Sequence, residues 1–225
     1  MTRSGIDADA LIRQFSEATA KQGDAVRQSV QEATLRALQG RELSLKSIKE
    51  VLKVVTQAVS AGAARNPAGE DVDALLSNAV AGMDAAVLKA VEASRRALEQ
   101  LVEQGVGLQE KQLKKALTDI EKMEDTLFAA IHKAAGEANG LQAPWAQALQ
   151  GFRQEGSATG GAAVNALQAL TTQSQAALRE GRALGQRGAQ ALLEHYAALA
   201  SGVLIGMSGA MAGAPTSAKP SRTKR

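Results

Sequence analysis

The sequence predicts an all-α protein, in which long amphipathic helices form an antiparallel bundle or coiled coil and a disordered basic tail follows at the C-terminus. Three observations support this prediction. Alanine accounts for 46 of the 225 residues, and the other common residues also favour helices. Only four prolines interrupt the chain. Aromatic residues make up 2% of it, so a thick globular core is harder to fill than the thin interface between alanine-rich helices.

The first helical segment is expected from about Asp7 to Gln39. Asp7 suits the N-cap position, where a carboxylate accepts a hydrogen bond from a backbone N–H of the first turn. Gly23 is expected to weaken the middle of the segment, and Gly40 is a natural stop.

A heptad seam marks the second helix, which Ser44 can cap. Its apolar residues recur at steps of three and four, as they do in a coiled coil. The seam forms either the core of a monomeric bundle or a self-association surface between copies. Its residues are Leu45, Ile48, Leu52, Val55 and Val59.

Apolar residues also recur with the period of a helix over 71–135. The apolar phase shifts at Gly105–Gly107, which indicates either a bend in one long helix or two separate helices. Farther along, Pro144 is well placed at the first position of a short helix. Residues 156–161, rich in glycine, predict a flexible linker, and a last helix is expected from Ala162 into the apolar C-terminal segment.

These boundaries divide the chain into four regions. An N-terminal helical hairpin is expected over 1–66 and a long coiled-coil-like region over 67–140. The C-terminal helices over 141–214 end in an apolar segment rich in glycine and alanine, and 215–225 is the disordered basic tail.

Few residues offer reactive chemistry. The chain has no cysteine, which excludes disulfides, thiolate zinc sites and cysteine nucleophiles. Its two histidines, His132 and His195, have no second ligand at metal-binding spacing, and no phosphate-binding loop or nucleophile elbow occurs. We therefore expect a non-enzyme with no catalytic residue, cofactor, metal or small-molecule substrate.

The most informative stretch lies between Glu194 and Lys219, where 24 residues carry no formal charge. Gly202, Gly206, Gly209 and Gly213 give two GxxxG spacings, which let helices approach closely in a membrane. The stretch either contacts a lipid or polymer surface, spans a membrane, or packs in the bundle. The residues expected to make surface contact are Val203, Leu204, Ile205, Met207 and Met211.

The basic charge is concentrated at the end of the chain. The last seven residues carry four basic side chains and no acidic one, whereas the rest of the chain is close to neutral. Such a tail predicts weak, salt-sensitive contact with phosphates of nucleic acid or anionic lipid, or simply a solubilising terminus. The four residues are Lys219, Arg222, Lys224 and Arg225.

Long Ala/Gln/Leu helices, the lack of cysteine and a tail such as Pro215–Arg225 resemble phasins, bacterial proteins that coat polyhydroxyalkanoate granules. The resemblance covers roughly 71–225 and is compositional. Ala218-Lys219-Pro220 is a reduced form of the longer Ala-Lys-Pro tails found in some phasins. The resemblance implies amphipathic helices that lie on a hydrophobic polymer with their charged faces outward.

Three functions therefore stay open: a phasin-like coat of a polymer granule, a soluble coiled-coil scaffold oligomer, or a membrane-inserting helical protein that uses 196–214. The expected partners are another copy of the chain, in a homo-oligomer, and a hydrophobic polymer or lipid surface. The first residues, Met1–Ala10, contain two acids and no apolar run, which is unlike a signal peptide. We expect a cytoplasmic protein that associates with a granule or a membrane.

Overall fold

The computed structural model describes residues 7–19, 23–39, 41–65, 72–103, 110–179 and 196–212, without the side chains at several helix ends. Every regular element within these ranges is an α-helix, which confirms the predicted all-α class. The helices are α1 (Ala8–Thr19), α2 (Asp24–Gln39), α3 (Leu45–Ala64), α4 (Val72–Glu103), α5 (Glu110–Gly136), α6 (Gln142–Glu155), α7 (Ala158–Arg179) and α9 (Tyr196–Ala212).

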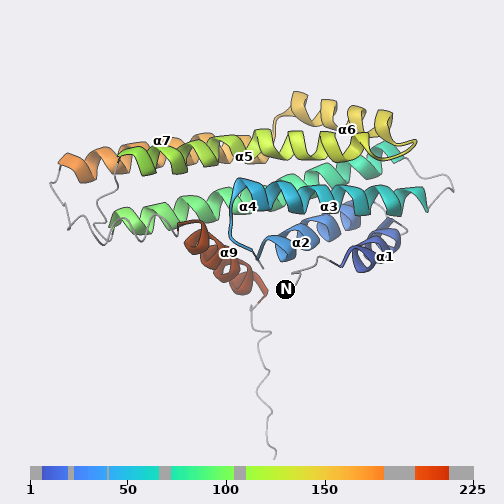
Figure 1. Cartoon of the computed structure of the whole chain (residues 1–225), viewed down its shortest axis with the longest axis horizontal. Helices are drawn as coiled ribbons and strands as arrows, with labels where there is room; N and C mark the ends of the chain where they lie inside the picture. The colour runs from blue at the N-terminus through green and yellow to red at the C-terminus, as the bar shows by residue number, and fades with distance from the viewer. Residues whose placement is uncertain are drawn as a thin grey trace, which may run out of the picture.

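The long helices α3, α4, α5 and α7 run along the long axis of the molecule (Figure 1). Helix α4 is central, because it packs against α2, α6, α7 and α9. Helix α3 packs against α1 and α5. In Figure 1, α4 and α5 run in opposite directions, and α1, α2 and α9 lie along one side of the bundle. The arrangement is the predicted antiparallel bundle.

The buried side chains form one cluster, to which the predicted regions 1–66, 67–140 and 141–214 all contribute. The heptad seam belongs to this cluster: four of its residues are buried and Leu45 is partly buried against them. In this arrangement the seam is the core of the chain's own bundle. Self-association through it would require the bundle to open.

The prediction of one helical segment from Asp7 to Gln39 was wrong in its middle. Gly23 adopts a φ of +43°, a left-handed conformation that glycine reaches without steric cost, and α2 begins only at Asp24. The break lets α1 pack on α3 while α2 packs on α4. The predicted start is confirmed, since Asp7 Oδ1 accepts a hydrogen bond of 2.9 Å from the Ala10 N–H.

The region 71–135 forms two helices, α4 and α5, rather than one bent helix. Gly105–Gly107 lie outside the described residues. The predicted cap of α3 is confirmed, because Ser44 Oγ accepts a hydrogen bond of 3.2 Å from the Ser47 N–H. Pro144 is the third residue of α6, two positions later than expected but still within the first turn of the helix.

The expected linker over 156–161 is mostly helical. Only Gly156 and Ser157 separate α6 from α7, and Gly156 has a φ of +85°. Two side chains cap the start of α7 at Ala158. Ser157 Oγ accepts a hydrogen bond of 2.8 Å from the Gly160 N–H, as an N-cap serine does. The carboxylate of Asp84 on α4 accepts hydrogen bonds of 3.0 Å from the Ala158 N–H and 3.1 Å from the Thr159 N–H. A local serine and a side chain from a distant helix thus together start a helix in a glycine-rich stretch.

Candidate functional site

Helix α9 is the candidate site because it is apolar on all sides but packs against the bundle on only one of them. It has no charged residue, and apolar side chains are distributed around its whole circumference. The side that faces the bundle carries Tyr196, Ala200, Ser201 and Leu204, all of which are buried. The remaining side is exposed, although a helix that is apolar all round is normally buried all round.

We call the exposed side the α9 outer face. Leu199 keeps 40% and Ile205 keeps 50% of the side-chain surface exposed. Gly202 lies between them on the helix surface, and a Cβ built on Gly202 or Gly206 meets no atom within 4 Å. The outer face is therefore a shallow, uncharged surface with two apolar ridges. Its residues are Ala198, Leu199, Gly202, Ile205 and Gly206.

The structure separates the surface residues predicted from the sequence. Ile205 is on the outer face, Val203 and Met207 are partly buried against the core, and Leu204 is fully buried. Consecutive residues of a helix point about 100° apart, so a contiguous apolar run cannot share one face. The side chain of Met211 lies outside the described residues.

Leu199 was missed by the sequence analysis. It lies outside the Val203–Met207 run, but helical periodicity places it beside Gly202 and Gly206 on the same side of α9. Leu199 and Ile205 lie three residues before and three residues after Gly202, so a search for helical spacing around Gly202, rather than for the most apolar run, would have found it.

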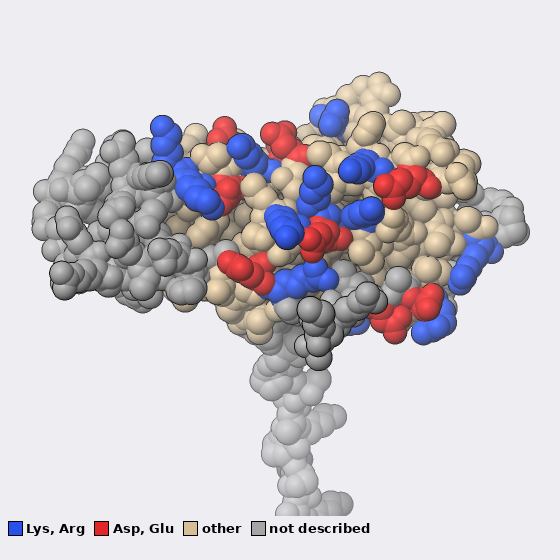
Figure 2. All heavy atoms as spheres, viewed as in Figure 1, with Lys and Arg blue, Asp and Glu red and all other residues tan. Residues whose placement is uncertain are grey.

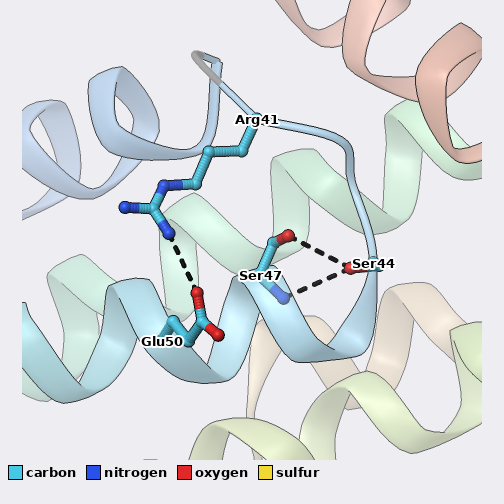
Figure 3. Close-up of polar contacts among 4 residues, drawn as sticks. All are labelled: Arg41, Ser44, Ser47 and Glu50. Carbon is cyan, nitrogen blue, oxygen red and sulfur yellow. Dashed lines mark hydrogen bonds and ion pairs between the residues drawn. The ribbon is translucent and has the colours of Figure 1, made fainter. Parts of the chain in front are cut away.

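A polar corner between α2 and α3 holds one side of α9. Ser201 Oγ donates a 2.7 Å hydrogen bond to the backbone carbonyl of Arg41. Figure 3 shows how this corner is built: the Arg41 guanidinium donates a hydrogen bond of 3.1 Å to Glu50, and Ser44 contacts Ser47 at the start of α3. Arg41 and Ser44, two residues of this corner, are thus both hydrogen-bonded to side chains of α3.

A second polar contact joins α9 to α5. The buried Tyr196 side chain lies near the carboxylate of Asp119, which also forms an ion pair of 3.0 Å with Lys115. Burial raises the pKa of Tyr196 well above its usual value, and the negative charge of Asp119 raises it further. The phenol therefore stays protonated beside the carboxylate.

The charged side chains lie elsewhere. Basic and acidic residues are interspersed over the body of the bundle (Figure 2), whereas helix α9 itself contains no charged residue. The predicted phosphate-contacting residues Lys219, Arg222, Lys224 and Arg225 lie outside the described residues. Within the part of the chain that the structure describes, no group of three His, Cys, Asp or Glu side chains could hold a metal ion.

A family model matches residues 1–213. The chain belongs to the family of unknown function DUF6781. The DUF6781 match includes the whole of α9 and stops before the four basic residues of the tail. The family description gives no link to phasins. No curated protein and no solved structure matches the chain.

Among the described residues of this DUF6781 protein, one helix is long and apolar enough to cross a membrane, and it is α4 rather than α9. That window of α4 is 61% buried inside the bundle, as expected for a core helix. The apolar part of α9 is the shorter stretch Ala198–Met207.

A small surface groove of about 390 Å³ lies where α3 and α5 end. Its floor includes Ser60, whose hydroxyl accepts a 3.0 Å hydrogen bond from the indole of Trp145. Four alanines and the side chains of Gln57 and Glu137 form part of its walls, and those two side chains are hydrogen-bonded to each other. The polar groups of the groove thus serve the packing of α3, α5 and α6.

Proposed function

We propose that the protein is a non-enzymatic surface protein that coats a hydrophobic polymer granule in the manner of a phasin, and that the α9 outer face makes the contact. One observation carries the proposal: an uncharged helix is held on the bundle with Leu199 and Ile205 turned outward. A contiguous exposed apolar patch on a folded protein commonly marks an interaction site.

The rest of the bundle suits the outward side of such a coat. The apolar residues of the other helices are largely packed in the common core, and charged side chains of both signs cover the face seen in Figure 2. A layer of these bundles would present charge to water and so limit coalescence of the coated particles. The proposed location is the bacterial cytoplasm, on the granule surface.

A second candidate function is a soluble scaffold oligomer. The open space above Gly202 and Gly206 favours it, because two helices approach closely where both lack side chains. Membrane insertion through α9 is a weaker third candidate. Its 17 residues span about 26 Å at 1.5 Å per residue, less than the roughly 30 Å of a hydrocarbon core.

The test compares two exposed apolar side chains. Ile205→Asp places a charge on the α9 outer face, and Val164→Asp places one on α7, where Val164 is 54% exposed. Purified proteins are mixed with polyhydroxyalkanoate particles and sedimented, and their mass in solution is measured by light scattering. The proposal predicts that wild type and Val164→Asp bind the particles and that Ile205→Asp does not.

Fluorescent fusions of the same variants in a polymer-accumulating bacterium extend the test to the cell. A point variant is preferable to deletion of 195–214, because deletion would also remove the buried Leu204 from the core. Granule rims for wild type and diffuse signal for Ile205→Asp are expected. If the wild type is diffuse and ignores the particles, the granule function is wrong; a mass that falls only in Ile205→Asp would then favour the scaffold.

A further inference from the structure

The groove where α3 and α5 end combines apolar walls with a concentration of negative charge. Its volume of about 390 Å³ is at the low end of the range of small-ligand sites. The C-terminal end of each helix carries a partial negative charge of about half an elementary charge. The carboxylate of Glu137, the residue after α5, also lines the groove. Three sources of negative potential therefore meet at one place.

Positive charge is scarce on this groove. Its lining includes no Lys, Arg or His among the residues that the structure describes. Helix α3 has no basic residue in its last turn, and neither Arg65 nor Lys133, the nearest basic residues in sequence to the two helix ends, lines the groove. Lys53 lies 3.7 Å from the Glu137 carboxylate, but it is one turn before Gln57 on α3 and so farther from the end of that helix. The chain thus neutralises the groove only in part.

The internal contacts of the groove leave acceptor atoms available. Gln57 Nε2 donates a hydrogen bond of 3.0 Å to Glu137 Oε2, and Lys53 contacts the same oxygen. Glu137 Oε1 has no partner among the described residues, and the Glu137 side chain keeps 48% of its surface exposed. The side-chain carbonyls of Gln57 and Asn139 add two neutral acceptors. A cationic donor can therefore bind here while the existing hydrogen bond stays in place.

The shape and chemistry of the groove select the kind of cation. A calcium ion takes six to eight oxygen ligands, and one carboxylate with two amides supplies too few. An alkyl chain suits the apolar walls, which are formed by Ala61, Ala64, Ala134, Ala138 and Leu141. We propose that the groove binds a small primary aliphatic amine, with its ammonium group at Glu137 and its alkyl chain against these walls. The proposal goes beyond granule coating and does not depend on it.

Trp145 can report binding at the groove. It is the one tryptophan of the chain, and its buried indole donates to Ser60, which lines the groove. Isotope-labelled full-length protein is titrated with diaminobutane at fixed pH and ionic strength, and the indole N–H signal is followed by NMR. Butanediol, of the same length but uncharged, is the control ligand. We expect a saturable shift of the indole signal with the diamine and none with the diol.

Three variants locate the site. Glu137→Gln removes the negative charge, and the affinity for the diamine should fall at least about fivefold, as loss of one close charge pair in water requires. Glu121→Gln is the matched control, since it neutralises an exposed carboxylate of α5 roughly 20 Å away and should bind as wild type does. Ala64→Leu fills the groove from an exposed position without changing its charge, and it should also weaken binding.

An equal response to diol and diamine, or no saturable shift in wild type, would overturn the proposal. Unchanged affinity in Glu137→Gln or in Ala64→Leu would do the same, because the ammonium group or the alkyl chain would then bind elsewhere. A lysine blocked at both backbone ends carries the same ammonium group on a side chain. If it binds as tightly as the diamine, the groove accepts a lysine of a partner; if it binds more weakly, the site is one for a free amine.

Discussion

Asp84 helps to cap helix α7 by accepting a hydrogen bond from Thr159, 75 residues farther along the chain. One carboxylate oxygen accepts the Thr159 N–H, the other accepts the Ala158 N–H, and the Thr159 hydroxyl donates 3.0 Å to the Asp84 carbonyl. Both Asp84 and Thr159 are buried. The N-terminal end of a helix attracts negative charge, so the central helix α4 holds α7 in place electrostatically as well as by packing.

Replacing Asp84 should therefore destabilise the whole bundle. Asp84→Ala leaves the buried Thr159 N–H and the part-buried Ala158 N–H without this acceptor, and we expect the free energy of unfolding to fall by about 2 kcal/mol. Asp84→Asn should lose less, because its amide oxygen still accepts one bond. Urea unfolding followed by circular dichroism measures both. The control is Asp125→Ala on the exposed surface of α5, and an equal loss in the control would contradict the capping role.

Gly82 permits the close crossing of α2 and α4. A Cβ at Gly82 would lie 2.5 Å from the backbone oxygen of Arg27, so Gly82→Ala must move a helix backbone. We expect a loss of about 2 kcal/mol in unfolding free energy. Gly151 of α6 has open space around it, and Gly151→Ala should stabilise by up to about 1 kcal/mol through helix propensity. Thermal melts of both variants show whether the signs differ, as packing requires.

Ser94 should be a site of easy stabilisation. Its hydroxyl is buried in α4 and has no hydrogen-bond partner among the described residues. Ser94→Ala removes that unsatisfied group, and we expect a gain of about 1 kcal/mol. Ser60→Ala is the opposite case, because it removes the acceptor of the Trp145 indole and should destabilise. A loss of stability in Ser94→Ala would show that its hydroxyl has a partner after all.

Tyr196 should resist ionisation while the protein is folded. Since its pKa is raised in the folded state, its contribution to stability is complete below the unfolded pKa of about 10 and is lost as pH rises above it. Tyr196 is the one tyrosine of the chain, so tyrosinate absorbance reports it alone. We expect no tyrosinate signal at a pH where a free phenol is half ionised, and a signal that grows together with alkaline unfolding.

Asp119→Asn checks the physical cause of that shift. It removes the negative charge that adds to the effect of burial, so ionisation should begin at lower pH than in wild type. Ionisation of wild-type Tyr196 near pH 10 in a folded protein would contradict its burial against Asp119.

The sequence predicted correctly those features that depend only on residues close together in the chain. The caps at Asp7 and Ser44 and the buried seam of α3 follow from spacing within a few residues. At the start of α7, the Ser157 cap is local and could have been predicted, whereas the hydrogen bonds of Asp84 come from another helix and could not. The split of α1 from α2 depends on which helix each one packs against, which Gly23 alone does not reveal.

The candidate site shows the same limit. Absence of charge identified the segment around Val203–Met207, but the absence of an amphipathic pattern left its orientation undetermined. Leu204 and Ile205 are equally apolar in sequence, yet one is fully buried and the other is half exposed. The contacts of Ser201 with Arg41 and of Tyr196 with Asp119 join residues far apart in the chain, so no local rule finds them.

The central place of α4 also has a consequence for biosynthesis. Helix α4 is synthesised before α6, α7 and α9, three of the four helices that pack most extensively against it. At about 5–20 residues per second, roughly 5–20 s pass between the completion of α4 and the start of α9. During that interval a nascent segment with the length and hydropathy of a membrane span lacks part of its cover. We therefore expect ribosome-bound chaperones, which shield apolar segments, to assist the folding of this chain during its synthesis.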